Sequence, residues 1–112
     1  MFIINFLKKR KREKIRNRIQ KLNVKAAKYL KLSKVESQNA EKFQKLIDSH
    51  LSLTHPYSSQ NYIYHQTMVE LHIQEWSENL TNHTAASSEY KAMYDNCLEE
   101  IETLKSELLS LC

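Results

Sequence analysis

The absence of glycine constrains the fold of this chain more than any other feature. Among its 112 residues there is no glycine and a single proline, Pro56. Tight hairpin turns, phosphate-binding loops and nucleophile elbows depend on glycine, because other residues take up positive φ or a close backbone approach only at a cost. Helices joined by few loops have no such need. The sequence therefore predicts an all-α protein and argues against β-rich and nucleotide-binding folds.

Apolar spacing in the first half of the chain predicts two helices. Residues 5–32 carry apolar residues at gaps of four and three, the spacing of one helical face: Ile15, Ile19, Leu22, Ala26 and Tyr29. The pattern then breaks at Ser33-Lys34-Val35-Glu36, which has the form of a capping box at a helix start. We therefore expect a second helix over 34–52, with Val35, Phe43, Leu46, Ile47 and Leu51 on its apolar face. One long kinked helix is the alternative.

Two further helices are expected in the second half, after a loop around His55-Pro56. The third, over 60–80, has a main apolar stripe of Tyr62, Val69, Ile73, Trp76 and Leu80, and a second stripe of Tyr64, Met68 and Leu71. Capping residues at 81–84 predict the start of the last helix, over 84–111. Its apolar residues recur at gaps of three and four: Ala86, Tyr90, Met93, Cys97, Ile101, Leu104, Leu108 and Leu111.

These segments predict one domain, residues 1–112, formed by a small antiparallel bundle of four helices, or of three if the first two are continuous. The last helix also has the spacing of a coiled-coil seam. The bundle is favoured because the other stripes need partners too. The third helix, with apolar residues on two faces, is either central in the bundle or offers one face to a partner.

The sequence lacks the residue patterns that several classes of protein need. Serines and threonines crowd expected caps and loops, where bonding to the backbone explains them, so we expect no enzyme and no cofactor. His65 and His72 lie two helical turns apart, about 10 Å, which is too far for one metal ion. Cys97 is expected to pack as a small hydrophobe and Cys112 to be free. Without a secretory signal or a membrane span, the expected location is cytoplasmic.

Charge is divided unevenly along the chain. Residues 1–45 carry fifteen lysines and arginines against three acidic residues, a net charge of +12, whereas residues 46–112 have a net charge of −8. The basic residues include a cluster, Lys8, Lys9, Arg10, Lys11 and Arg12, and a stripe within an arc of about 80° on the first helix. The members of this stripe are Arg10, Lys14, Arg18, Lys21, Lys25 and Lys28.

Three hypotheses about function follow from these patterns. The basic cluster and basic stripe predict contact with the phosphates of nucleic acid, or of a nucleoprotein, without sequence specificity. Alternatively, Tyr64, Met68 and Leu71 bind a protein target, as a small inhibitor, immunity-type protein or accessory subunit would. In the third, Phe2, Ile3, Phe6 and Leu7 enter a membrane surface while residues 8–12 bind anionic headgroups. The same four apolar residues could instead cap the core, and a homodimer is left open.

Overall fold

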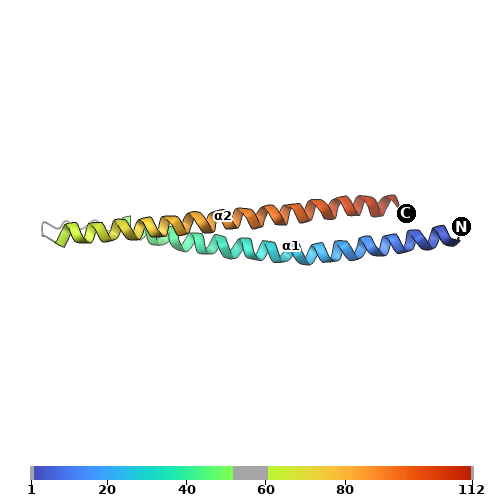
Figure 1. Ribbon diagram of the computed structural model, residues 1–112, viewed down its shortest axis with the longest axis horizontal. Helices are drawn as coiled ribbons and strands as arrows, with labels where there is room; N and C mark the ends of the chain where they lie inside the picture. Colours follow the sequence, from blue (N-terminus) through green and yellow to red (C-terminus); the bar gives the residue numbers. More distant parts are fainter. Residues whose placement is uncertain (1, 52–60, 112) are drawn as a thin grey trace. The chain divides into compact units, whose positions relative to one another are not determined.

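Over the residues that it describes, the computed structural model is all-helical and contains two helices, α1 (Phe2–Leu51) and α2 (Asn61–Ser110) (Figure 1). It describes residues 2–51 and 61–111, and the side chains of 2–51 and 66–111. The expected loop around Pro56 lies outside these ranges. The chain forms two compact units: unit 1 comprises Met1–Leu32 and Glu89–Cys112, and unit 2 comprises Ser33–Ser88.

The prediction of a four-helix or three-helix bundle is wrong, because each pair of expected helices is one helix. The expected second helix continues the first within α1, and the expected third and fourth form α2. Neither helix contains the glycine or proline that would stop it. Thr81, expected at a cap, instead donates a hydrogen bond from its hydroxyl to the carbonyl of Ser77 within α2 (2.9 Å).

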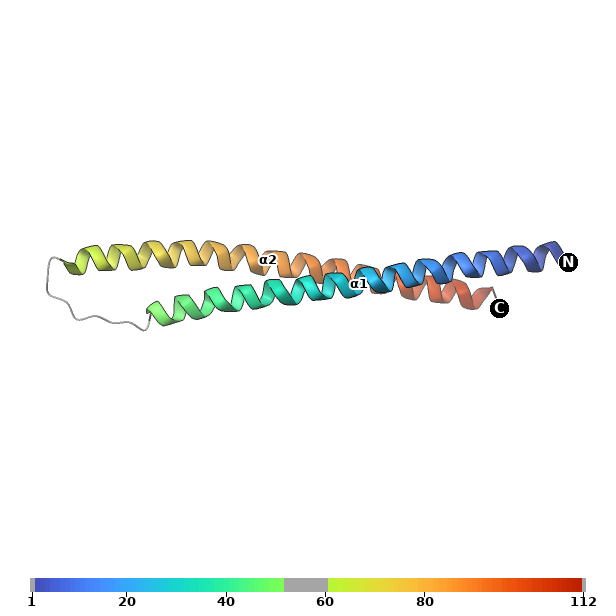
Figure 2. The ribbon, with the colours of Figure 1, turned by 90° about the horizontal axis from the view of Figure 1, so that it is seen from below.

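In unit 1, the segments of α1 and α2 lie side by side and antiparallel, as Figures 1 and 2 show. Their core contains Leu22, Ala26, Cys97 and Ile101, which are at most 7% exposed. Ile19, Tyr29, Tyr94 and Leu104 pack around it, and the rings of Tyr29 and Tyr90 stack at 6.4 Å. The prediction that Cys97 packs as a hydrophobe is confirmed; Cys112 lies outside the described residues.

In unit 2, a series of buried and half-buried positions on each helix keeps the spacing of four and three. On α1 these positions are Ser33, Glu36, Ala40, Phe43, Ile47 and His50, and on α2 they are Val69, Ile73, Trp76, Leu80, His83 and Ser87. Such spacing is the heptad pattern of a two-stranded coiled coil, in which each helix buries one narrow stripe. Outside that stripe lie Val35, Leu46 and Leu51, which are exposed although the sequence predicts them on a buried apolar face.

The same pattern corrects the stripe predicted for the last helix. Met93 is 43% exposed, and Tyr94 packs against the core in its place. Likewise Ser87, rather than Ala86, bonds across to α1. The sequence-based stripe followed apolar residues through this region, whereas the heptad spacing here selects a serine and a tyrosine.

Candidate nucleic-acid interface

The predicted basic residues all lie on the α1 segment of unit 1, and most of them are open to solvent. Arg12 is half-buried and the other nine are exposed. They are exposed because the apolar stripe of α1, which includes Ile15, Leu22 and Ala26, takes up the side of the helix that meets α2. From Arg10 to Lys28 the basic stripe extends about 27 Å along the helix axis.

Two of these cations form ion pairs with α2. Arg18 binds Glu100 through two guanidinium nitrogens, at 3.0 and 3.4 Å from the same carboxylate oxygen. The Nζ of Lys11 lies 3.8 Å from Glu107. Both pairs are about half exposed, so each contributes only about 0.2–1 kcal/mol. The basic stripe therefore lies partly against acidic residues of α2, as its position beside the apolar stripe allows.

The remaining cations exceed the acidic residues that could neutralise them. On the α2 segment of unit 1, Asp95 pairs with Lys91 and Glu102 with Lys105 of the same helix. Unit 1 carries fourteen lysines and arginines against seven acidic residues, a net charge of +7, whereas unit 2 has a net charge of −3. Within the described residues, no ion pair involves the other eight predicted cations: Lys8, Lys9, Arg10, Arg12, Lys14, Lys21, Lys25 and Lys28.

The spacing of the two ion pairs explains why no described acidic residue pairs with Lys25. Moving seven residues along α1, from Lys11 to Arg18, moves seven residues back along α2, from Glu107 to Glu100. One more step places Lys25 opposite Met93, which cannot accept a charge-assisted hydrogen bond.

Sequence reasoning missed two further basic residues on this segment. Arg16 and Lys31 are exposed, and neither forms an ion pair in the part of the chain that the structure describes. They were left out because they lie outside the 80° arc. The arc is a poor criterion here: a helix with one neighbour exposes most of its circumference, so exposed cations need not share a stripe.

The residues of the two alternative hypotheses are also exposed where they are described. On α2 in unit 2, Leu71 is 54% and Met68 is 36% exposed, while the side chain of Tyr64 lies outside the described residues. On α1, the large apolar residues Phe2, Ile3, Ile4, Phe6 and Leu7 are 53–85% exposed. They therefore do not cap the core of unit 1.

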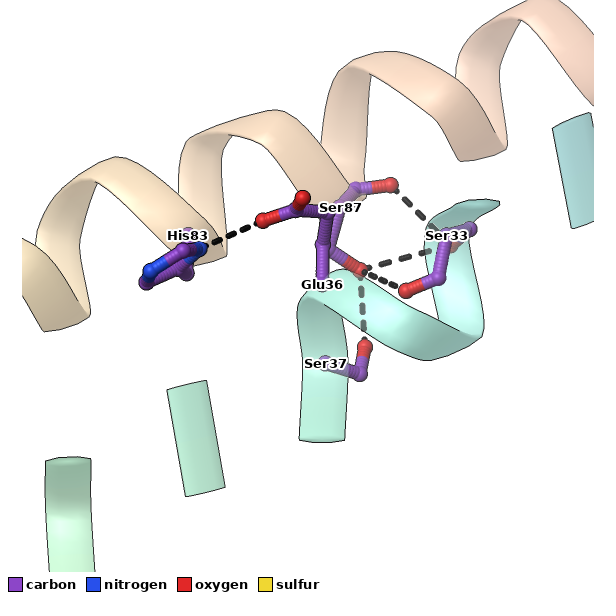
Figure 3. Close-up of polar contacts among 5 residues, drawn as sticks. All are labelled: Ser33, Glu36, Ser37, His83 and Ser87. Carbon is purple, nitrogen blue, oxygen red and sulfur yellow. Dashed lines mark hydrogen bonds and ion pairs between the residues drawn. The ribbon is translucent and has the colours of Figure 1, made fainter. Parts of the chain in front are cut away.

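Unit 2 contains a cluster of polar contacts that the sequence did not reveal (Figure 3). The hydroxyl of Ser33 donates to the carbonyl of Ser87 (3.1 Å), and the hydroxyl of Ser87 donates to the carbonyl of Ser33 (3.0 Å). Ser37 lies 2.7 Å from the Ser87 hydroxyl, and the Nδ1 of His83 lies 2.5 Å from Glu36. Extending the spacing of α1 past Tyr29 reaches Ser33 and Glu36, whereas their partners on α2 follow only from the pairing of the two helices.

This polar cluster lacks the arrangement of a hydrolytic site. A catalytic serine needs a histidine within hydrogen-bond reach, but the serine hydroxyls bond to one another and to carbonyls. His83 bonds to Glu36 and stacks on Phe43 at 5.5 Å. Among the five residues of this cluster, no serine–histidine hydrogen bond occurs.

Neither a metal site nor a membrane span is found in the described parts of the chain. No group of three or more histidine, cysteine or acidic residues there could hold a metal ion. His72 stacks on Trp76 at 5.5 Å, His50 meets the same ring edge-on at 4.6 Å, and the side chain of His65 is outside the described set. Neither helix, over its described residues, has a stretch both long and apolar enough to cross a membrane.

Comparisons with protein-family models, with curated proteins and with solved structures find no match to this chain. Its function therefore has to be inferred from its own residues.

Proposed function

We propose that this protein is a non-catalytic binding protein whose α1 segment in unit 1 contacts double-stranded nucleic acid through the phosphates. The observation that supports this function is the surplus of charge there. Eight predicted cations of this segment form no ion pair within residues 2–51 and 66–111, and the unit has a net charge of +7. Lysines and arginines that neutralise phosphates release condensed counterions, and this release drives binding without reading sequence.

Next to the basic stripe, the packing of Tyr29 favours contact with duplex over stacking of single-stranded bases. Proteins that bind single strands stack bases on exposed aromatic rings that lie among their cations. Tyr29 follows Lys28 directly but is half-buried, with its ring stacked on Tyr90. Because the Tyr29 ring already stacks on Tyr90, a base is not expected to stack on it. Contacts of the stripe with phosphates do not need an aromatic ring.

The polar contacts of the described residues support a role without catalysis. The hydroxyls of Thr81, Thr103 and Ser110 donate to carbonyls one turn back in their own helix. In that state they cap or bend the helix and are not activated nucleophiles. Ser33 and Ser87 bond to each other's carbonyls in the same inactive way.

Charge reversal of the basic stripe tests this function. The variant Lys14→Glu/Lys21→Glu/Lys28→Glu changes three exposed residues that form no ion pair among the described contacts. The control, Lys34→Glu/Lys42→Glu/Lys45→Glu, makes the same change in charge on the same helix but in unit 2, and there Lys45 pairs with the exposed Glu41. Binding to a labelled 24-base-pair duplex is measured by fluorescence anisotropy across a series of salt concentrations.

We expect the wild type to bind the duplex with a Kd of about 10⁻⁴–10⁻⁶ M near physiological salt. The unit 1 variant should lose this binding while circular dichroism shows an unchanged helix content, because exposed charges contribute little to stability. The control should keep most of the affinity. Equal losses in the two variants, or no binding by the wild type at low salt, would refute the proposal.

A protein target is a second candidate, supported by the exposure of Leu71 and Met68 on α2. Contiguous apolar patches on protein surfaces often mark binding sites, and these two residues lie about one turn apart on α2. A partner that copurifies in a one-to-one ratio after nuclease treatment, and is lost with Met68→Ser/Leu71→Ser, would support this candidate. Retention of the partner by that variant would exclude this surface.

A further inference from the structure

We infer that the beginning of α1 is an anchor for anionic lipid surfaces, a function beyond the proposed contact with nucleic acid. The anchor has two parts: an apolar segment, formed by Phe2, Ile3, Ile4, Phe6 and Leu7, and the basic cluster at residues 8–12. All five apolar side chains are more than half exposed, and Phe2 reaches 85%. Phosphate binding leaves these side chains in water, whereas insertion among lipid acyl chains covers them.

Helical geometry gives the apolar segment one side that can enter a bilayer surface. At about 100° per residue, Phe2, Ile3, Phe6 and Leu7 fall within an arc of about 140°. An apolar face of this width can settle about 5–10 Å into the boundary between headgroups and acyl chains. Two phenylalanines provide the large rigid apolar area that such interfacial segments use.

The basic cluster supplies the second attraction that stable membrane attachment needs. Its five cations follow the apolar segment directly, and Lys11 forms the one ion pair found for them among the described residues. Lysines and arginines next to an inserted segment lie at the level of anionic headgroups and gain from the negative surface potential.

The same cations favour a lipid surface, and not a second copy of this chain, as the partner that covers the apolar segment. A copy that covered the apolar segment would bring its own five adjacent cations close to these five. Like charges at short range oppose such a contact. An anionic lipid surface instead covers the apolar residues and neutralises the cluster at once.

Vesicle flotation with the 112-residue chain tests the anchor in the absence of nucleic acid. One set of vesicles is phosphatidylcholine, and the other also contains about one-third phosphatidylserine. The test variant is Phe2→Ser/Phe6→Ser. The control is Val24→Ser/Leu109→Ser, because these two residues are also exposed apolar positions of unit 1, at 69% and 74%.

We expect the wild type and the control to float with the anionic vesicles and much less with phosphatidylcholine alone. The test variant should lose at least about tenfold in partition coefficient. It should still bind duplex as the wild type does, which separates failure of the anchor from failure of the proposed function. Equal flotation of test and control variants, or no flotation of the wild type, overturns the inference. So does sedimentation showing a dimer that Phe2→Ser/Phe6→Ser dissociates.

Discussion

At the scale of the residue, Met93 occupies the position on α2 that the seven-residue series places opposite Lys25 of the basic stripe. Lys11 and Arg18 meet glutamates on α2, and the next position in that seven-residue series holds a methionine that is 43% exposed. A carboxylate at this position would complete a third ion pair. Free charge on α1 thus depends on which residues α2 places opposite it, as well as on α1 itself.

We predict that Met93→Glu weakens duplex binding without changing any basic residue. The new carboxylate should pair with Lys25, so the slope of log K against log salt should lose about 0.9, the contribution of one phosphate contact. Helix content should stay the same, since an exposed substitution changes stability by about 0.5 kcal/mol or less.

Two controls separate pairing from size and from net charge. Met93→Gln has the length of the glutamate without its charge, and Leu98→Glu adds the same charge at an exposed position outside the seven-residue series. A slope changed as much by Leu98→Glu as by Met93→Glu would contradict the pairing of Lys25 with position 93.

At the scale of the element, the heptad stripe decides which apolar residues matter for stability. Leu46 and Ile47 are neighbours on α1, and a four-helix bundle would bury both. In unit 2 Ile47 is 7% exposed, whereas Leu46 is 41% exposed. Leucine and isoleucine have nearly the same size and polarity. Comparing the loss of stability on truncating each side chain therefore tests whether the protein is a helix pair or a four-helix bundle.

We predict that Ile47→Ala lowers the free energy of unfolding by about 2–4 kcal/mol, because it removes buried methyl groups. Leu46→Ala should cost less than about 1 kcal/mol. Urea unfolding followed by Trp76 fluorescence measures both, since this single tryptophan lies in unit 2. Equal losses for the two variants would show that Leu46 is buried in solution and that the two-helix description fails there.

The helical class and most of the core stripe could be predicted from the sequence, but the number of helices could not. The lack of glycine and the spacing from Ile15 to Tyr29 are local signals, and they are sufficient to predict a helical protein with this apolar stripe. Ser33 and Glu36 were misread because a capping box and a pair of polar core residues have the same letters. Only the partners across the pair, Ser87 and His83, distinguish the two. Such partners depend on tertiary pairing, which local patterns do not contain.

The candidate site divides in the same way. The basic residues could be predicted from the sequence, since lysine and arginine carry a positive charge wherever they are exposed. The sequence does not show which of them form ion pairs, because the glutamates that pair with Lys11 and Arg18 lie more than eighty residues further along the chain. The sequence also does not determine whether Phe2 and Phe6 are buried, and the structure leaves both of them exposed.

At the scale of the whole molecule, charge is separated between the two units, at +7 for unit 1 and −3 for unit 2. A polyanion should therefore contact one unit and avoid the other. Lysines of both units lie on the same helix, so a single experiment on the unmodified chain can compare them under identical conditions.

The most direct test of nucleic-acid binding by unit 1 is lysine footprinting of the wild type. The chain is acetylated briefly with and without excess duplex at low salt, and the modification of each lysine is read by mass spectrometry. We predict protection of Lys14, Lys21, Lys25 and Lys28 by the duplex, because lysines in contact with phosphates are shielded from the reagent. Lys34, Lys42 and Lys45 in unit 2 should be modified equally in both samples. Equal modification of the unit 1 lysines with and without duplex, or protection of the unit 2 lysines to the same degree, would contradict the proposed function.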